Sequence, residues 1–235
     1  MEMRRLLIIG YCVLGLSLLS CSNDDDGPAA KVNASASGIW TDERDGEQYG
    51  WVRYDGLDWM TENCRYDIGD DVNSTIYQDA DEYQGYAALS QRNLARYGRL
   101  YTLAGAKAAC PVGWRLPTDA DWQRLEQALG MSSAEAESDD WRGNIAWSLL
   151  SVYDHTADLS LLLGGLYSAY WTVGSTPGWR YLGTYGYYWT DTPDLQKEGE
   201  YYYVRKLAYN RYSVCRESME PSGYKLSVRF VRDAG

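Results

Sequence analysis

The sequence predicts an α+β fold with short twisted antiparallel strands, two main helices and long loops. Aromatic-rich runs on either side of an Asp-Gly pair at residues 55–56 indicate a hairpin, and a capping motif before an amphipathic run indicates a helix from residue 118. The second half is rich in Gly, Tyr and Trp, and its last segments alternate between apolar and polar residues, as strands do. The 235 residues, 45% of them hydrophobic, suffice for one sizeable core.

The N-terminal segment is typical of a secretory signal. Two arginines precede an apolar, uncharged run at residues 6–20, which is too short to span a membrane comfortably. The run ends in Leu18-Leu19-Ser20-Cys21, which resembles a bacterial lipobox, where cleavage precedes the cysteine and its thiol is lipidated. We therefore predict a signal peptide at residues 1–20 and lipidation of Cys21. The alternative is an ordinary signal peptide with a chance cysteine.

The segment after the cysteine is predicted to be a flexible tether. Residues 21–38 carry a short acidic run and then Gly, Pro, Ala and Ser, a composition that buries little apolar surface. A cysteine followed closely by acidic residues also resembles the surface-export signal of Bacteroidetes lipoproteins, with a solvated linker as the alternative. The sequence thus predicts an outer-membrane lipoprotein, exposed at the cell surface, with one domain at residues 39–235.

Charge and composition exclude several classes of function. Asp and Glu number 33 against 22 Lys and Arg, so the formal net charge is −11 and nothing drives counterion release from nucleic acid. The same charge is repelled by anionic lipid, so we expect membrane contact through the N-terminal lipid only. His155 is the single histidine, which nearly excludes multi-histidine metal sites and weakens any Ser-His-Asp arrangement.

The first half of the domain is predicted to hold a hairpin, a long loop and a short helix. The hairpin joins residues 49–54 to residues 57–60, and the polar stretch at residues 67–96 is typical of a long loop. Small residues at 101–110 favour a helix, which Pro111 and the glycine that follows would end.

The helix after residue 118 has the clearest local signals. Thr118 and Asp121 form a capping box, and acidic side chains stand at the positive end of the helix dipole. Trp122, Leu125 and Leu129 fall on one face, and a glycine at 130 supplies the stop. Further along, residues 201–209 and 224–232 alternate well enough to be strands.

The cysteines of the mature domain are odd in number. Cys64, Cys110 and Cys215 remain after the signal peptide and the lipidated residue are set aside. In an exported, oxidising setting we expect one disulfide pair among them and one buried thiol. The sequence does not choose the pair.

Several blocks of this chain resemble the Fibrobacter succinogenes major paralogous domain, in that family's order and over nearly all of residues 38–235. The most specific blocks are Trp59-Met60, Tyr97-Gly98-Arg99-Leu100-Tyr101, Cys110-Pro111-Val112-Gly113-Trp114-Arg115-Leu116-Pro117-Thr118-Asp119, Gly186-Tyr187-Tyr188-Trp189-Thr190 and Ser227-Val228-Arg229-Phe230-Val231-Arg232-Asp233. The stretch at residues 113–122 and the closing block also resemble formylglycine-generating-type domains. The resemblance implies a C-type-lectin-like fold and a lipoprotein of gut or environmental Bacteroidetes.

One departure from that family concerns the cysteines. Members often carry cysteine where this chain has Phe230, and the resemblance implies that it would pair with the cysteine matching Cys110. That partner is missing here. Cys110 then either pairs with Cys64 or Cys215 or is a buried thiol.

The residues argue against catalysis. Formylglycine-generating enzymes use a reactive cysteine pair near the C-terminus, and related sulfoxide-forming enzymes hold iron with histidines; neither set is present. Several carboxylate pairs are present, but adjacency in the sequence does not show two of them facing each other across a sugar, and Asp119 and Asp121 already have a role at a helix start. We therefore predict a non-enzyme without metal or cofactor. Calcium is the open alternative, because residues 67–73 are rich in oxygen ligands and Trp189-Thr190-Asp191 faintly resembles a lectin motif.

The aromatic residues carry the functional prediction. The chain has 22 Tyr and 10 Trp against 1 Phe, and Tyr and Trp suit wet binding surfaces. In the lectin-like fold the long loops and adjoining strands form the recognition face, where we place the candidate ligand-binding residues Tyr185, Tyr187, Tyr188, Trp189, Tyr201, Tyr203, Arg205 and Tyr212. The predicted partner is a glycan or polysaccharide. A protein-binding adhesin or envelope assembly component is the first alternative, an enzyme of unknown type is a less favoured one, and ordinary family packing is the simplest account of any single aromatic.

Overall fold

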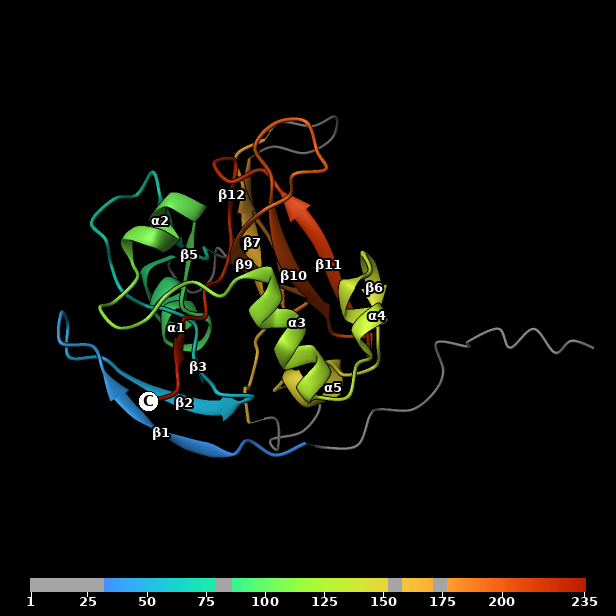
Figure 1. Cartoon of the computed structure of the whole chain (residues 1–235). Helices are drawn as coiled ribbons and strands as arrows, with labels where there is room; N and C mark the ends of the chain where they lie inside the picture. Colours follow the sequence, from blue (N-terminus) through green and yellow to red (C-terminus); the bar gives the residue numbers. More distant parts are fainter. Residues whose placement is uncertain (1–31, 79–85, 152–157, 171–176) are drawn as a thin grey trace, which may run out of the picture.

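The structure, a computed structural model, describes residues 32–78, 86–151, 158–170 and 177–235 (Figure 1). A small sheet and a larger sheet are arranged around the helix α3, which lies across one face of the larger sheet (Figure 1). Strands and short helices are interspersed along the chain, which confirms the predicted α+β class. Within the described ranges, no helix is both long enough and apolar enough to cross a membrane.

The small sheet brings the two ends of the described chain together. Its four strands, in spatial order, are β1 (Ala36–Thr41), β2 (Gln48–Tyr54), β3 (Leu57–Met60) and β13 (Val231–Asp233). Asp55 and Gly56 both have positive φ, as the tight turn between β2 and β3 requires, so the predicted hairpin is confirmed. Residues 36–38 are paired in β1, so the sheet includes a part of the chain that we assigned to the tether.

The larger sheet has seven strands. In spatial order these are β12 (Tyr224–Lys225), β7 (Gly164–Ser168), β9 (Tyr185–Pro193), β10 (Tyr202–Ala208), β11 (Val214–Met219) and β6 (Asp140–Arg142), with β8 (Gly178–Leu182) also paired to β7. The strands β7 and β9 pair at Gly165 and Gly186, where a Cβ would lie 2.3 Å from the Arg180 carbonyl oxygen or 2.5 Å from the Leu162 carbonyl oxygen. These glycines let the backbones approach closely.

Two predicted elements of the first half need correction. A short ribbon of β4 (Ser74–Ile76) and β5 (Arg99–Tyr101) flanks α1 (Tyr86–Tyr97), so a helix occupies the end of the stretch that we predicted to be a loop. The predicted helix at 101–110 is shorter, because β5 precedes it and Thr102 caps α2 (Leu103–Ala108) through Gly105 N.

The predicted capping box is confirmed at α3 (Asp119–Ala128). Thr118 Oγ1 accepts from Asp121 N at 3.1 Å, and Asp121 Oδ2 accepts from Thr118 N at 2.7 Å. Trp122 and Leu125 are buried on the predicted face, and Gly130 follows the helix end with φ +110°. Two shorter helices, α4 (Ser133–Glu137) and α5 (Ala146–Leu149), lie between α3 and the larger sheet's later strands in sequence.

Strand β9 is covered on both faces by hydrophobic core. Tyr188 belongs to the cluster that includes Trp122 and Leu207, whereas Trp189 belongs to the cluster that includes Tyr101. The predicted strand at residues 224–232 is interrupted: β12 ends at Lys225, single bridges follow it, and β13 joins the small sheet. The apolar side chains of that segment are nevertheless buried, so it closes both cores.

Candidate functional site

Five of the eight predicted ligand-binding residues are buried, which corrects their assignment. Trp189, Tyr188 and Arg205 expose no side-chain surface that a ligand could touch, and Tyr187 and Tyr203 are also buried. A side chain that solvent does not reach cannot stack on a glycan at the surface. These five residues are structural in this conformation.

The hydrogen bonds of the two buried aromatics on β9 explain their position. Tyr188 Oη donates to the Leu162 carbonyl at 2.7 Å and accepts from Leu162 N at 2.8 Å. Trp189 Nε1 donates to the Tyr101 carbonyl at 2.7 Å. Each aromatic residue therefore fills a core and satisfies backbone groups of a distant segment.

Arg205 lies in a buried ionic network between β10 and α3. Its Nη1 donates to Asp119 Oδ1 at 2.6 Å and its Nε donates to Glu126 Oε1 at 2.7 Å. Glu126 also accepts from Arg142 at 2.7 Å, and Asp119 from Arg216 at 2.9 Å. Burial alone would raise the pKa of Asp119, but hydrogen bonds and charges from Arg216 and Arg205 outweigh it, so this pKa lies below its ordinary value.

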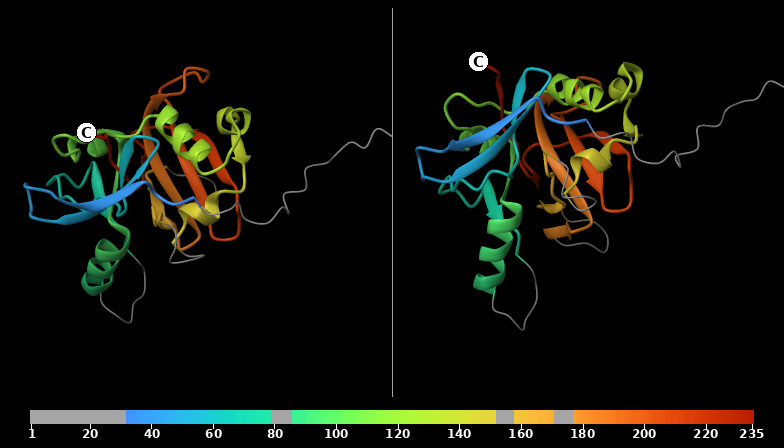
Figure 2. Two further views of the ribbon diagram at one scale, coloured as in Figure 1. Left: turned by 60° about the horizontal axis from the view of Figure 1, so that its bottom comes forward. Right: turned by 90° about the horizontal axis from the view of Figure 1, so that it is seen from below.

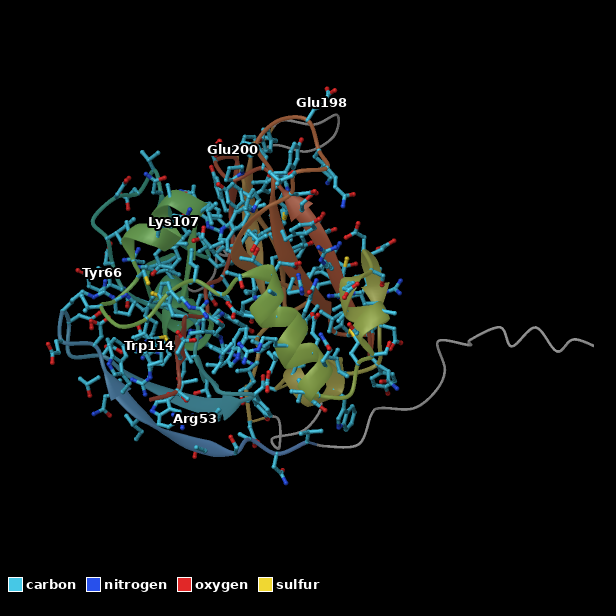
Figure 3. All side chains as sticks on the ribbon, viewed as in Figure 1. Arg53, Tyr66, Lys107, Trp114, Glu198 and Glu200 are labelled. Atoms are coloured by element: carbon cyan, nitrogen blue, oxygen red, sulfur yellow. The ribbon has the colours of Figure 1, made fainter. Side chains whose placement is uncertain are left out.

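Three predicted residues do reach solvent, at opposite ends of the larger sheet. Tyr201 lies after the loop that follows β9, with Lys197 Nζ 5.0 Å from its ring centroid. Glu198 and Glu200 occupy that same loop (Figure 3). Tyr185 begins β9 at the other end, and Tyr212 lies near that end in the loop between β10 and β11. The eight residues therefore do not form one face.

Aromatic residues that are at least partly exposed near Tyr185 form, with two cationic side chains, a surface that we call the aromatic platform. Its members come from four strands of the larger sheet, β6, β8, β9 and β10, and from the turn after β10: Trp141, Tyr181, Tyr185, Lys206 and Arg211. Tyr181 is 47% exposed, and its ring meets that of Tyr185 edge to face at 5.4 Å. Lys206 Nζ lies 5.2 Å from the Tyr185 ring centroid and 5.6 Å from that of Trp141. Arg211 covers the other side of the platform, 4.7 Å from the Trp141 centroid.

Strand register explains why these residues share a face. Lys206 stands opposite Tyr187 on β9 and opposite Cys215 on β11, and Cys215 stands opposite Trp141 on β6. Directly opposed residues point to the same side of a sheet, whereas Arg205, one residue earlier, points toward α3. The platform is thus on the face of the sheet opposite α3, with Glu217 3.6 Å from Lys206 at its edge.

Trp141 and Tyr181 are absent from the predicted set, because each lies in a short strand without a clear alternating pattern. The profile of the Fibrobacter succinogenes major domain family matches residues 52–232. The chain belongs to this family. No match was found among curated proteins or among solved structures.

In this Fibrobacter succinogenes major domain the three cysteines are free thiols, in place of the predicted disulfide pair. The Cys64 thiol lies 3.3 Å from Tyr101 Oη, and the Cys110 thiol donates to the Trp114 carbonyl at 3.1 Å. Burial raises the pKa of Cys110 to about 11 and that of Cys215 to about 12. The family resemblance implied a partner for Cys110 at position 230, and Phe230 is buried there.

The predicted oxygen ligands of this family member are engaged with the protein itself. Asp67 pairs with Arg99, and Asp70 accepts from the backbone of Val72 at 2.9 Å and from Asn73. Asp191 pairs with a lysine at 2.7 Å. Across the ranges that the structure describes, no three His, Cys, Asp or Glu side chains are grouped as a metal site would need. Cys21 and His155 lie outside those ranges, so their predicted roles rest on the sequence.

Proposed function

We propose that this domain is a non-catalytic module that binds a glycan or polysaccharide through the aromatic platform. The observation that carries the proposal is the combination of half-exposed rings with charged donors on one sheet face. Tyr181 and Tyr185 meet edge to face, and Lys206 lies between the Tyr185 and Trp141 rings. Of the residues first predicted, Tyr185 is part of this surface, and Tyr212 lies beside Trp147, 6.0 Å between ring centroids, in the adjoining turn.

The chemistry of the platform suits a sugar. The faces of aromatic rings attract the C–H groups on the flat side of a pyranose, and rigid Tyr and Trp side chains lose little entropy on binding. Lys206, Arg211 and Glu217 supply donors and acceptors for hydroxyl groups around those rings. Tyr187 is buried beneath Lys206, with its ring centroid 5.6 Å from Nζ, and supports the platform from below. Such support favours a preorganised binding surface.

A role in binding also fits what the carboxylates do. Asp119 is held by Arg205 and Arg216, and Asp121 accepts from Arg115 at 2.5 Å and from Thr118. A glycosidase needs one carboxyl to exchange a proton and another to face it across the sugar, and these groups are committed to arginine instead. This supports a binding role over a hydrolytic one.

We propose that the domain has a C-type-lectin-like fold and acts at the outside of an outer membrane. The long connection between β9 and β10, together with the presence of both β1 and β13 in one small sheet, supports that fold. The lipobox-like residues before Cys21 and the acidic tether after it support lipid anchoring and surface exposure. The bound polysaccharide would then be met outside the cell.

The experiment that tests the function is a polysaccharide array probed with the purified protein, with calcium and with chelator. We expect binding to fall about tenfold or more in Tyr181→Ala and Tyr185→Ala, since each loses a stacking ring. Tyr170→Ala is the matched control, because Tyr170 is 39% exposed and bonds to Glu220 near the opposite end of the sheet. A blank array, or equal loss in all three variants, overturns the proposal; after a blank array, cross-linking on intact cells would look for a protein partner.

A further inference from the structure

A second surface feature is the open edge of the small sheet. β1 is the outermost strand there, and no other described element overlies it in the view from below (Figure 2). Asp42 N donates at 2.8 Å to the carbonyl of Glu47, the residue that stands opposite it when the register of β1 and β2 is continued. With a period of two, the backbone N–H and C=O groups of Ser37, Ile39 and Thr41 therefore point away from β2. Within the described ranges, none of these groups has a hydrogen-bond partner.

The edge of β1 lacks the features that usually protect such a strand. Edge strands are kept from pairing by being short, by Lys or Pro, by bulges, or by a covering segment. The other edge of the small sheet is covered, because Arg115 N donates to the Val231 carbonyl at 2.8 Å and Val231 N donates to the Arg115 carbonyl at 2.9 Å. At one edge of the larger sheet, β6 has three residues. β1 has six residues, none of them charged or proline, and it pairs with β2 without a bulge, so it can serve as a template for another strand.

The side chains at this edge offer apolar surface on both faces of the sheet. On one face Ile39 is 72% exposed. On the other face the ring of Trp51 lies over Gly38, because a Cβ on this glycine would be 2.7 Å from the ring. An aromatic ring that covers an edge glycine extends over the edge strand itself. Trp40, two residues along the same face, is partly exposed, so both faces of the edge carry apolar side chains.

The sequence of β1 is complementary to itself in an antiparallel register. When the pairing is centred on Ile39, this residue faces Ile39 of a second copy, and Ser37 faces Thr41 of that copy. Ser and Thr hydroxyls pair favourably across strands, and the central pair covers two exposed apolar side chains. On the other face Gly38 stands opposite Trp40 of the second copy, at the place where the Trp51 ring already lies.

Charge favours this edge for contact between copies. The net charge of each chain is −11, so two copies repel each other over much of their surface. β1 is uncharged, and Asp42, which follows it, is buried and pairs with Arg44 at 2.6 Å. Arg53, which stands opposite the first residue of β1, pairs with Asp58 at 2.6 Å. The strand can therefore meet a second copy without placing like charges opposite each other.

We propose that two copies of this domain pair through β1, in an antiparallel register centred on Ile39. The pairing joins two four-stranded sheets into one continuous sheet of eight strands, through the same surface on each copy. The contact is small, so the dimer is weak and forms as concentration rises. This proposal is independent of the glycan-binding function. Where that function holds, a dimer presents two aromatic platforms to one repeating polymer and gains avidity.

Sedimentation velocity of the purified full chain, over a concentration series up to about 0.5 mM, measures the association. We expect the wild type to form dimers and Ile39→Lys to weaken them about tenfold or more, because two ammonium groups would stand directly opposite each other. Val72→Lys is the matched control: Val72 is 78% exposed in the loop before β4, and the charge change is the same. It should alter the dimer affinity less than about twofold. Thermal unfolding verifies that both variants keep the fold.

Disulfide cross-linking reads the register separately. Ser37→Cys and Thr41→Cys chains are treated with oxidised glutathione, each alone and as an equal mixture, beside the wild type, which measures links through the native cysteines. Directly opposed residues of a hydrogen-bonded pair have Cα atoms about 5.5 Å apart, which suits a disulfide. We therefore expect the mixture to give more cross-linked dimer than either chain alone, and Ile39→Cys to cross-link by itself.

The outcomes decide the proposal. A wild-type chain that stays monomeric throughout the series overturns it and leaves the edge to a different polypeptide. Equal dimer affinity in Ile39→Lys and Val72→Lys places the contact elsewhere. Ser37→Cys and Thr41→Cys chains that cross-link as well alone as together exclude the register centred on Ile39. Loss of the dimer in Ile39→Lys alone, with preferential cross-linking in the mixture, supports pairing through β1.

Discussion

Arg205 and Asp119 form an ion pair, with 2.6 Å between Nη1 and Oδ1, that is almost entirely shielded from solvent. The pair joins β10 to the first turn of α3, and Glu126, two turns later on the same helix, binds Arg205 as well. The next residue along β10, Lys206, points to the opposite face and lies between the rings of the aromatic platform. The network that holds α3 therefore also fixes the strand that carries the platform.

We expect Arg205→Ala to lower the free energy of unfolding by about 3–5 kcal/mol. The substitution leaves the Glu126 and Asp119 carboxylates buried without the positive charge that Arg205 supplies to both. Urea unfolding followed by fluorescence measures the loss. Lys206→Ala is the matched control, since Lys206 is only partly buried and its partner Glu217 is 3.6 Å away; we expect a loss below about 1 kcal/mol. Equal losses in the two variants would contradict the buried network as the stabilising element.

Three buried carboxyl groups that pair with arginines predict how stability depends on pH. The pKa values of Asp119, Asp121 and Asp58 lie below the ordinary value of 3.8; burial opposes this shift, and their arginine partners produce it. A carboxyl whose pKa is lower in the folded state stabilises the fold above its unfolded pKa and loses that effect as pH falls through the folded pKa. We expect the free energy of unfolding to be nearly constant between about pH 5 and 7 and to fall below about pH 4.

Denaturant unfolding at a series of pH values checks this expectation. Asp119→Asn should be less stable than the wild type at pH 7, and its stability should fall less between about pH 5 and pH 3, because one of the three carboxyl groups no longer titrates. A variant that keeps the full acid dependence would show that Asp119 does not contribute to it.

Local signals explain which elements could be predicted from the sequence. The capping box at Thr118 and the Asp55-Gly56 turn each depend on residues a few positions apart, so both can be predicted from the sequence. The helix α1 projects from the body (Figure 2) and has no acidic residue in its first turn, so it lacks the charge signal that marks the start of α3.

The candidate site was less predictable, because burial depends on partners far along the chain. Trp189 Nε1 binds the carbonyl of Tyr101, and Tyr188 packs on Trp122, 66 positions earlier in the printed sequence. A run of aromatic residues does not reveal that both faces of its strand are covered. Trp141 enters the platform only through the pairing of β6 with β11, which no local pattern in the sequence indicates.

We expect Gly105→Ala to destabilise the protein, although alanine ordinarily favours a helix over glycine by about 1 kcal/mol. A Cβ at Gly105 would lie 2.2 Å from the Asn73 carbonyl oxygen, so α2 or the loop before β4 must shift. Thermal unfolding measures the effect. Ala104→Ser, at the adjacent exposed position, is the control and should change stability by less than about 0.5 kcal/mol. A gain in stability in Gly105→Ala would contradict this close packing.

The free thiols predict an alkylation pattern. Cys64 and Cys215 are buried, and burial raises the pKa of each thiol and of Cys110, so the reactive thiolate is scarce at pH 8. We expect iodoacetamide to react slowly with these three residues in the native protein. After unfolding without reductant all three should react readily, and mass spectrometry counts the alkylated cysteines. If only one of them reacts after unfolding, two are joined in a disulfide, as the sequence first suggested.

Tyr185 and Tyr188 allow the platform and the core to be tested separately. Tyr188→Phe removes the hydroxyl that bonds both backbone groups of Leu162, and we expect it to lower the free energy of unfolding by about 1–3 kcal/mol, because those groups are left without that partner. Its polysaccharide affinity should be unchanged under conditions where it is fully folded. Tyr185→Ala should do the reverse, with little loss of stability and weaker binding, since its ring is half-exposed at the start of β9. Urea unfolding and array binding on the two variants measure both quantities. Weaker binding in Tyr188→Phe together with unchanged binding in Tyr185→Ala would place the ligand elsewhere.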